Sequence, residues 1–433
     1  MRGLCGAVRL LPRLRRSSLL DLHRQHLPAA FTHNDSLWQR RSCSTGEKAG
    51  ISRRQYISLY NYTPLDEKKL PKLRRDMREQ WGDLGVVGRI YIAEEGINGQ
   101  LVVPEPAINV FEHSFPRLLE NAKLFYGQLI EDQPGDKRPA EPFHKLDIRI
   151  RDQILHDGFQ DGPLNLQQSG NSLLPEQWHQ KLKERNETDD SNTLVLDVRN
   201  FYEHEIGRFD GATRIMVDTF RDTFDALDEI LENHKKEHDG QKPKEVMMYC
   251  TGGIRCEKVG AYLTQYKNIS NVQKLHGGIV NYMRFLKEQR QAAVETRGHS
   301  DDAVEKEISL FKGKNFVFDQ RCVGELTESE EVTDDILGQC FQCGDPCNHH
   351  TNCSNLMCHG LILQCSKCAT SMLGACSEAC KQEYVKMESM TPEEQRNYRK
   401  ANALKWEPKN PNSVSSLKYI KFRPASPELL QKA

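Results

Sequence analysis

The 433-residue sequence has no run of apolar residues that approaches the roughly 18 needed to cross a bilayer. Near its start it also lacks the apolar core, roughly 7–15 residues long, of a secretory signal. Internal repeats and low-complexity tracts are absent too. Because this length exceeds one ordinary hydrophobic core, we expect a globular protein of roughly two to four domains with no membrane partner.

Acidic residues are missing from the first twenty positions, which contain five arginines. Arg9, Arg13 and Arg16 recur there at helical spacing among leucines. This composition is typical of a mitochondrial transit peptide, with cleavage expected near residues 40–48. A disordered basic tail on a cytoplasmic protein is the alternative.

The net charge is only −1, but it is unevenly distributed. Residues 1–50 carry a surplus of six positive charges and residues 381–433 a surplus of five, so the segment between them sums to about −12. A basic tail on an acidic body favours a polyanionic partner, although a solvated charged tail would have the same composition.

Cysteine is scarce along most of the chain and crowded in one place. Nine of the 14 cysteines fall between residues 340 and 380. A cluster of Cys-x-x-Cys pairs favours metal binding in a reducing compartment over a disulfide framework. Each pair lets two thiolates reach one tetrahedral ion from a tight turn.

We expect two structural zinc ions, because a zinc ion enclosed by four thiolates has no open catalytic position. Cys347 belongs to neither of the two expected ligand sets. A pairing in which the two sets interleave along the chain fits the spacings equally well. An iron–sulfur cluster is the main alternative to zinc. His349, His350 and His359 could substitute for a cysteine. The two expected ligand sets are Cys340, Cys343, Cys365 and Cys368, and Cys353, Cys358, Cys376 and Cys380.

Residues 55–151 are predicted to run strand, helix, strand, strand, helix, strand. That order is typical of the ferredoxin-like split βαβ fold with an antiparallel sheet. Gly96-Ile-Asn-Gly99 is expected to form a hairpin turn. A substrate role for Glu94, Glu95 and Asn98 around this turn is an alternative to a structural one.

Residues 160–172 are rich in Gly, Gln, Asn and Ser, which predicts a linker. Strands and helices alternate beyond it, which predicts a parallel sheet with helices on both faces. Ligands in such folds bind at the carboxyl ends of strands, and Cys250 lies at such an end. The predicted strands are 193–199, 245–250 and 271–278, and the predicted helices are 174–184, 218–237, 256–266 and 279–289.

Cys250 ends an apolar strand and is followed by a short loop containing two glycines. The glycines let successive N–H groups turn toward one centre, and the next helix adds a positive partial charge at its N-terminus. Together with Arg255, these groups stabilise a thiolate, which is the nucleophilic form. We predict that Cys250 and Arg255 are catalytic; a buried cysteine before a plain turn is the alternative. The predicted loop residues are Thr251, Gly252, Gly253 and Ile254.

Three further residues are candidates for supporting roles. Cys256 could resolve an oxidised or persulfidated Cys250, although a packing thiol explains it equally well. Asp197 and Arg199 end a predicted strand and could orient Arg255 or the loop. A structural salt bridge between them is the alternative.

The segment Cys250-Thr-Gly-Gly-Ile-Arg255 resembles the active-site loop of rhodanese domains, Cys-x-x-Gly-x-Arg. Residues 196–212 and 275–279 resemble further parts of that domain. Family members with this spacing between cysteine and arginine handle sulfur, whereas the related phosphatases have one residue more.

Five ordered motifs resemble the bacterial rhodanese-like tRNA uridine hydroxylases and their eukaryotic relatives, the rhodanese-like domain-containing proteins. They cover about residues 55–385. The motifs are AEEGING (93–99), FHKLDIRIRDQI (143–154), YCTGGIRCEK (249–258), FKGKNFVFDQR (311–321) and CFQCGDPCNHHTNCSNLMC (340–358).

The resemblance implies a multidomain α+β and α/β protein. Its parts would be a ferredoxin- or acylphosphatase-like N-terminal domain, a rhodanese-like parallel-sheet domain and a small cysteine-rich zinc-binding C-terminal module. The resemblance also implies oxygen-dependent hydroxylation at C5 of the wobble uridine in tRNA, with molecular oxygen as co-substrate. The expected boundaries are 1–50 (transit peptide), 51–159, 160–172 (linker), 173–298 (rhodanese), 299–385 (zinc module) and 386–433 (basic tail).

Two other functions stay open from the residues alone. One is a sulfurtransferase that moves sulfane sulfur from thiosulfate or a persulfide donor to a thiophilic acceptor. The other is a non-enzymatic zinc-dependent RNA- or protein-binding module. A thiolate does not activate oxygen by itself, and the sequence has neither a 2-His-1-carboxylate signature nor a flavin motif.

Overall fold

The structure is a computed structural model that describes residues 53–131, 143–297, 309–316, 333–358, 360–402 and 421–423. The predicted transit peptide, His359 and the end of the FKGKNFVFDQR motif lie outside these residues. Within them, each helix is too short or too polar to cross a lipid bilayer.

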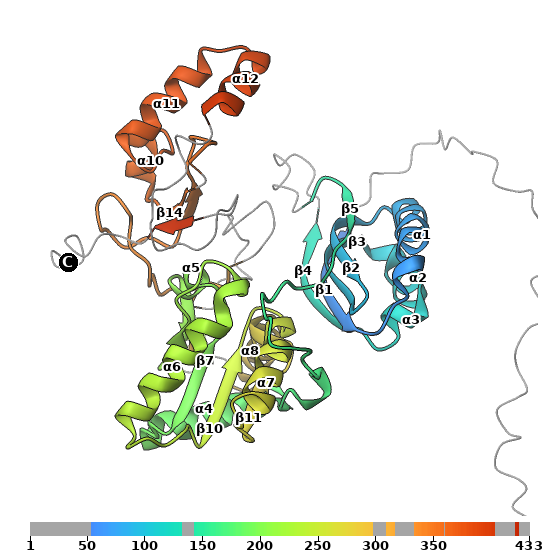
Figure 1. Cartoon of the computed structure of the whole chain (residues 1–433), viewed down its shortest axis with the longest axis vertical. Coiled ribbons are helices and arrows are strands. Elements are labelled where there is room, and N and C mark those ends of the chain that lie inside the picture. Colours follow the sequence, from blue (N-terminus) through green and yellow to red (C-terminus); the bar gives the residue numbers. More distant parts are fainter. Residues whose placement is uncertain are drawn as a thin grey trace, which may run out of the picture. The chain divides into compact units, whose positions relative to one another are not determined.

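The N-terminal domain is a five-stranded sheet in the order β4-β1-β3-β2-β5. Helices lie on one of its faces (Figure 1). The strands are β1 (Arg53–Tyr62), β2 (Val87–Ala93), β3 (Gly96–Pro104), β4 (Lys123–Glu131) and β5 (Leu146–Ile150). The helices are α1 (Leu70–Asp83), α2 (Ile108–His113) and α3 (Pro116–Leu119), with 3₁₀ turns at Glu67–Lys69 and Glu105–Ala107.

Alternation along the strands assigns each side chain to one face of this sheet. Ile57 and Leu59 of β1 are buried against the helices, where Trp81 of α1 lies 4.9 Å from Phe111 between ring centroids. The intervening β1 residues, Tyr56, Ser58 and Tyr60, therefore occupy the opposite face.

The sheet differs from the prediction in three ways. Strand β4 was not predicted, and it takes the place of the fourth strand of a ferredoxin-like sheet beside β1. Strand β5, predicted in that role, instead pairs in parallel with β2, so the sheet is mixed rather than antiparallel. The turn between β2 and β3 is formed by Glu94 and Glu95, and Gly96–Gly99 lies inside β3.

The second domain confirms the predicted parallel sheet, in the order β6-β11-β10-β7-β9. Its strands are β6 (Asn171–Leu173), β7 (Thr193–Asp197), β9 (Thr213–Arg214), β10 (Glu245–Tyr249) and β11 (Val272–Leu275). Its helices are α4 (Pro175–Thr188), α5 (Phe201–His204), α6 (Thr223–Glu237), α7 (Ile254–Gln265) and α8 (Gly278–Arg297), with 3₁₀ turns at Leu166–Gln168 and Phe220–Asp222.

Helices cover both faces of this sheet because its strands are apolar on both sides. Met247 of β10 packs with α4 and α8, whereas its neighbours Val246 and Met248 pack with α6 and α7. The predicted linker contributes to this domain as well, since its last residues enter β6 and its Ser169 is buried.

Strand β12 (Phe311–Gly313) pairs antiparallel with β8 (Gly207–Phe209). Phe311 is fully buried, with its ring 5.2 Å from that of Phe209 between centroids. Residues 309–316, predicted to belong to the zinc module, therefore complete the core of the parallel-sheet domain.

The cysteine-rich module contains strands β13 (His350–Asn352), β14 (Gly360–Leu363) and β15 (Lys421–Arg423). Strand β14 pairs antiparallel with β13 and in parallel with β15. Its helices are α10 (Ser366–Met372), α11 (Glu378–Glu388) and α12 (Pro392–Asn402). The segment predicted as a basic tail therefore includes a helix and a strand of this small sheet.

Candidate active site

The predicted loop lies between the carboxyl end of β10 and the first turn of α7. The Gly253 N–H donates to the Cys250 sulfur at 3.1 Å. Gly253 precedes α7 with a φ of 97°, a left-handed conformation that favours glycine. Cys250 is fully buried, whereas Thr251, Gly252 and Ile254 are half-buried, so the loop is the part of the site that solvent reaches.

The surroundings of Cys250 favour its thiolate. Burial alone would raise the pKa of this thiol, but a hydrogen bond from Cys256, the charge of Arg255 and backbone N–H groups of Cys256 and Arg255 lower it to about 6. Burial raises the pKa of Cys256 well above its ordinary value, and the neighbouring Cys250 raises it further. Cys250 is therefore ionised at neutral pH, and Cys256 is a neutral thiol that donates to it.

Arg255 is held by Glu203 of α5, which was not among the predicted site residues. The guanidinium donates to both carboxylate oxygens, at 2.7 and 3.0 Å, and the Thr251 hydroxyl donates to the same carboxylate at 3.0 Å. Glu203 also accepts the Asn200 N–H at 3.0 Å in a capping box. The Asn-x-x-Glu spacing would have revealed this helix cap, but not the pairing with Arg255 across 52 positions.

Asp197 and Arg199 pair with each other, as in the structural alternative. The Arg199 guanidinium donates to the Asp197 carboxylate at 2.8 and 2.6 Å, and both side chains are fully buried. Asp197 also accepts from the Tyr249 hydroxyl at 2.9 Å. Burial would raise the pKa of Asp197, but Arg199 and His204 hold it well below its usual range. This ion pair fixes the end of β7 beside β10.

The N-terminal sheet reaches the loop through Glu257, also in the first turn of α7. Its carboxylate accepts from Tyr60 of β1 at 3.2 Å, from Lys123 of β4 at 2.9 Å and from Lys274 of β11 at 2.6 Å. Burial would raise the pKa of Glu257, but Lys274 and Lys123 lower it to about 2. A charged Glu257 therefore joins the two sheets.

A second buried ion pair lies one residue further along α7. The Lys258 ammonium contacts Asp157 at 2.7 Å and Glu95 at 3.1 Å. Glu95 also accepts the Ile154 N–H at 2.7 Å, and Asn98 donates to the Ile154 carbonyl at 3.1 Å. Glu95 and Asn98 thus hold the chain that connects the two sheets.

The Cys250 loop lies close to the N-terminal sheet. A Cβ added to Gly252 would lie 3.6 Å from the Ser58 hydroxyl, and one added to Gly253 would lie 3.1 Å from the Tyr60 hydroxyl. Residues of the helix-free face of the N-terminal sheet therefore line one side of the loop.

The cysteine-rich module brings together eight sulfurs in two groups of four, and within each group all four lie within 4.8 Å of one another. The nearest pairs are 3.6–3.7 Å apart, close to the roughly 3.8 Å edge of a tetrahedron with 2.3 Å zinc–sulfur bonds. Both groups could hold a metal ion, and their donor chemistry suits zinc. The groups are Cys340, Cys343, Cys365 and Cys368, and Cys353, Cys358, Cys376 and Cys380.

Outside these groups lie Cys347 and two of the candidate substitutes, His349 and His350. The Cys347 sulfur accepts the His349 N–H at 3.4 Å. His350 is buried, and its ring centroid lies 5.0 Å from that of Phe316. Burial lowers the pKa of His350 to about 3, so this ring is neutral and packs as a core side chain.

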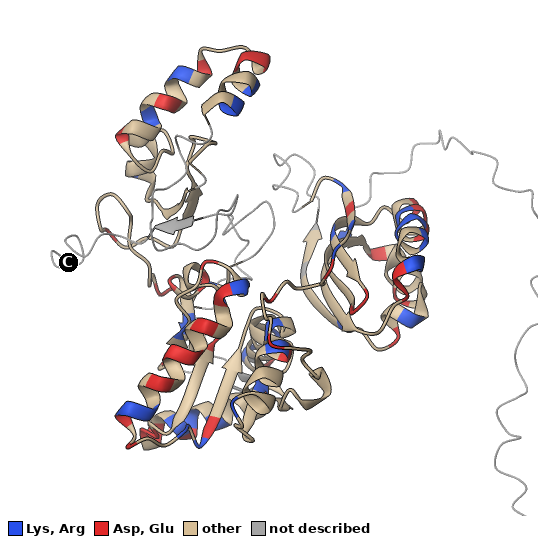
Figure 2. Ribbon diagram, viewed as in Figure 1, with Lys and Arg blue, Asp and Glu red and all other residues tan. Residues whose placement is uncertain are grey.

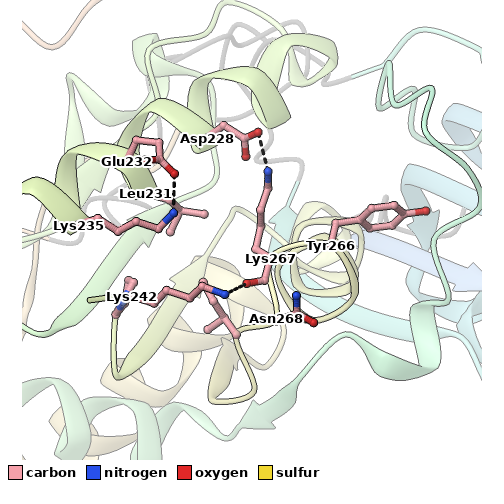
Figure 3. Close-up of a pocket in the computed structure, with 10 residues that line it drawn as sticks. Asp228, Leu231, Glu232, Lys235, Lys242, Tyr266, Lys267 and Asn268 are labelled. Carbon is pink, nitrogen blue, oxygen red and sulfur yellow. Dashed lines mark hydrogen bonds and ion pairs between the residues drawn. The ribbon is translucent and has the colours of Figure 1, made fainter. Parts of the chain in front are cut away.

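Figure 3 shows a cavity of about 230 Å³ that is lined in part by Lys242 and Lys267. Because Lys242 shortly precedes β10 and Cys250 follows it, the cavity lies near the opposite end of that strand. Lys267 pairs there with Asp228 at 2.6 Å and Lys235 with Glu232 at 2.5 Å. Two of the three lysines that line the cavity are thus paired with acids, and the third, Lys242, donates to the Lys267 carbonyl at 2.8 Å. The thiolate chemistry lies at the other end of the strand.

Three family models match the chain in order. The UPF0176 acylphosphatase-like domain matches residues 54–154, the rhodanese-like domain matches residues 177–284, and the rhodanese C-terminal model matches residues 312–381.

Curated tRNA uridine(34) hydroxylases are similar over most of their length. The protein of Photorhabdus laumondii is 36% identical over 353 residues, which is 81% of this chain and 86% of that protein. The protein of Enterobacter sp. strain 638 is 36% identical over 349 residues, or 80% and 85% of the two chains. This chain belongs to the tRNA uridine(34) hydroxylase family. Membership in this family confirms the resemblance drawn from the five motifs, and the enzyme class with it.

Proposed function

We propose that this protein hydroxylates C5 of uridine 34, the wobble position of tRNA, in an oxygen-dependent reaction. The observation that carries the proposal is the position of the Cys250 sulfur at the start of α7, where it accepts the Gly253 N–H at 3.1 Å. Burial would raise its pKa, but hydrogen bonding from Cys256 and the charge of Arg255 lower it there. Membership in the tRNA uridine(34) hydroxylase family supplies the substrate class.

The residues of the loop have distinct roles in this proposal. Cys250 is the nucleophile: its sulfur adds to C6 of the uracil ring, and the electron pair of the opened C5–C6 double bond makes C5 the carbanion that bonds to molecular oxygen. An external two-electron reductant of the thiol class cleaves the O–O bond, which leaves one oxygen atom on C5 as hydroxyl and releases the other as water. Loss of the C5 proton then restores the double bond and expels the Cys250 thiolate. Arg255 and the loop N–H groups stabilise the anionic sulfur before attack and after its release. Glu203 positions Arg255 through their paired hydrogen bonds.

Two structural zinc ions are part of the proposal. The two sulfur groups supply four thiolates each, and such closed sites hold a small module together without taking part in catalysis.

Residues 1–50 would direct the protein to mitochondria, which their arginine-rich, acid-poor start supports. Fractionation of cells that express the chain with and without residues 1–50 tests the import; equal distribution of the two would contradict it.

A sulfurtransferase is the second candidate, because the same low-pKa thiolate can carry sulfane sulfur. The two activities leave different products. Cys250→Ala should remove 5-hydroxyuridine and its derivatives from tRNA, measured by nucleoside mass spectrometry on mitochondrial and cytosolic tRNA separately. An unchanged nucleoside profile, together with rapid cyanide-dependent release of thiocyanate by the wild type, would replace the hydroxylase by the sulfurtransferase.

A further inference from the structure

The helix-free face of the N-terminal sheet carries a row of polar and aromatic side chains from the Cys250 loop to the far edge. Strand register places Tyr60 of β1 opposite Asn98 of β3, Asn98 opposite Tyr91 of β2, and Tyr91 opposite Arg149 of β5. Directly opposed residues share a face. The row starts beside Gly253 and crosses three strand spacings, or roughly 14 Å.

A second row runs parallel to the first. Ser58 lies opposite Gln100, Gln100 opposite Arg89, and Arg89 opposite Asp147. Ser58 is the side chain nearest to Gly252, and Arg89 is exposed. Both rows therefore begin at the loop. The first ends at the exposed Arg149, and the second passes the exposed Arg89 and ends at Asp147.

Positive charge collects at the far end of these rows. Arg149 pairs with Asp147 at 2.6 Å, and the Arg151 guanidinium lies 5.6 Å from the centre of the Tyr91 ring. Lys145 and Arg89 act on the same Asp147 carboxylate as Arg149, so three cations surround this one acid. Helix α1, on the opposite face of the sheet, instead mixes cations and acids along its length (Figure 2).

We propose that this face binds the single-stranded nucleotides of the tRNA anticodon loop that flank the target uridine. Tyr91 and the Arg151 guanidinium stack a base, and Arg89 and Arg149 contact phosphates. This inference rests on the proposed function, because it places the neighbouring nucleotides while position 34 enters the Cys250 loop.

Two physical arguments favour single-stranded RNA as the occupant. Accessible aromatic rings and guanidinium planes on a sheet stack unpaired bases, and a sheet of about four strands accommodates two or three of them. Tyr91 is half-buried and Arg151 is exposed, so both can present part of their planes to a base. A duplex offers phosphates but no free base faces, so it would gain from the arginines and not from Tyr91.

The test is binding of the full-length protein to a fluorescent anticodon stem–loop RNA with uridine at position 34, measured by anisotropy over a range of salt concentrations. Tyr91→Ala should weaken binding roughly 5- to 100-fold, and Tyr91→Phe should restore it. Arg89→Ala and Arg149→Ala should each lower the slope of log K against log salt by roughly 0.7, the value for one lost phosphate contact on a single strand.

Matched controls separate this face from general charge effects. Arg75→Ala and Arg78→Ala remove exposed arginines from α1, on the opposite face of the sheet, and should leave affinity and salt slope unchanged. A fully paired RNA duplex should show the effect of the arginine variants but not that of Tyr91→Ala. Because Arg89 is exposed, its variant retains the fold even if Tyr91→Ala does not.

Failure of this inference differs from failure of the proposed function. If Tyr91→Ala and both arginine variants bind the stem–loop like the wild type, or if the α1 variants weaken binding equally, the RNA-binding face is wrong while Cys250→Ala can still abolish 5-hydroxyuridine. If the face variants weaken binding but Cys250→Ala leaves tRNA unchanged, the face stands and the hydroxylase assignment fails.

Discussion

Arg255 and Glu203 form a buried, bidentate ion pair next to the Cys250 loop. The Glu203 side chain is fully buried and that of Arg255 is 8% exposed. Such a pair is costly to break, since removal of one partner leaves a buried charge without compensation.

Glu203→Gln should therefore reduce the free energy of unfolding by about 3 kcal/mol and slow the alkylation of Cys250. Urea unfolding measures the first effect, and mass spectrometry of the peptide containing Cys250 measures the second. Glu205→Gln is the matched control, because Glu205 forms a partly exposed pair with Arg214 and should cost at most about 1 kcal/mol. Equal losses for the two variants would contradict the positioning role of Glu203.

The thiolate at Cys250 predicts a specific pH dependence. Its pKa of about 6 means that alkylation should rise through pH 6 and level off above it, whereas an ordinary thiol continues to gain reactivity toward pH 9. Cys256→Ala removes a donor to the sulfur and should move the midpoint upward. A wild-type midpoint near that of free cysteine would show that the loop does not stabilise the anion.

Glu257 should make the contact between the two sheets sensitive to acid. Its pKa falls from 4.5 to about 2 in the folded protein, so its contribution of about 3 kcal/mol is complete above pH 4.5 and is lost as the pH falls toward 2. Urea unfolding should thus separate Glu257→Gln from the wild type at pH 7 and much less at pH 3. Glu232→Gln, at an exposed carboxylate, should match the wild type at both values. A Glu257→Gln deficit that persists undiminished at pH 3 would refute the assignment.

The two sulfur groups predict the metal content of the protein. Elemental analysis should find two zinc ions per chain in the wild type, and one in either Cys368→Ser or Cys376→Ser. Cys347→Ser is the control and should retain two, because Cys347 lies outside both groups. Loss of zinc from Cys347→Ser, or iron in place of zinc, would require a different ligand set.

Local sequence predicted the Cys250 loop well, because a strand end, two glycines and a helix start are encoded within a few residues. The two Cys-x-x-Cys pairs predicted one of the two four-sulfur groups for the same reason, since each pair is encoded within four residues. Glu203 and Tyr60 could not be predicted as partners, since they meet α7 only after the chain folds, at separations of 52 and 197 positions. Strand β4 was not predicted because its sequence, KLFYGQLIE, lacks the alternation of polar and apolar residues that indicates a strand.

The first turn of α7 gives four successive residues four different neighbours. Arg255 pairs with Glu203, Cys256 donates to Cys250, Glu257 holds Tyr60, and Lys258 holds Asp157. One helical turn therefore carries the donors to the sulfur and the contacts to both sheets. A substitution at Tyr60 or Asp157, which contact this turn from outside the parallel sheet, should change the reactivity of the Cys250 sulfur.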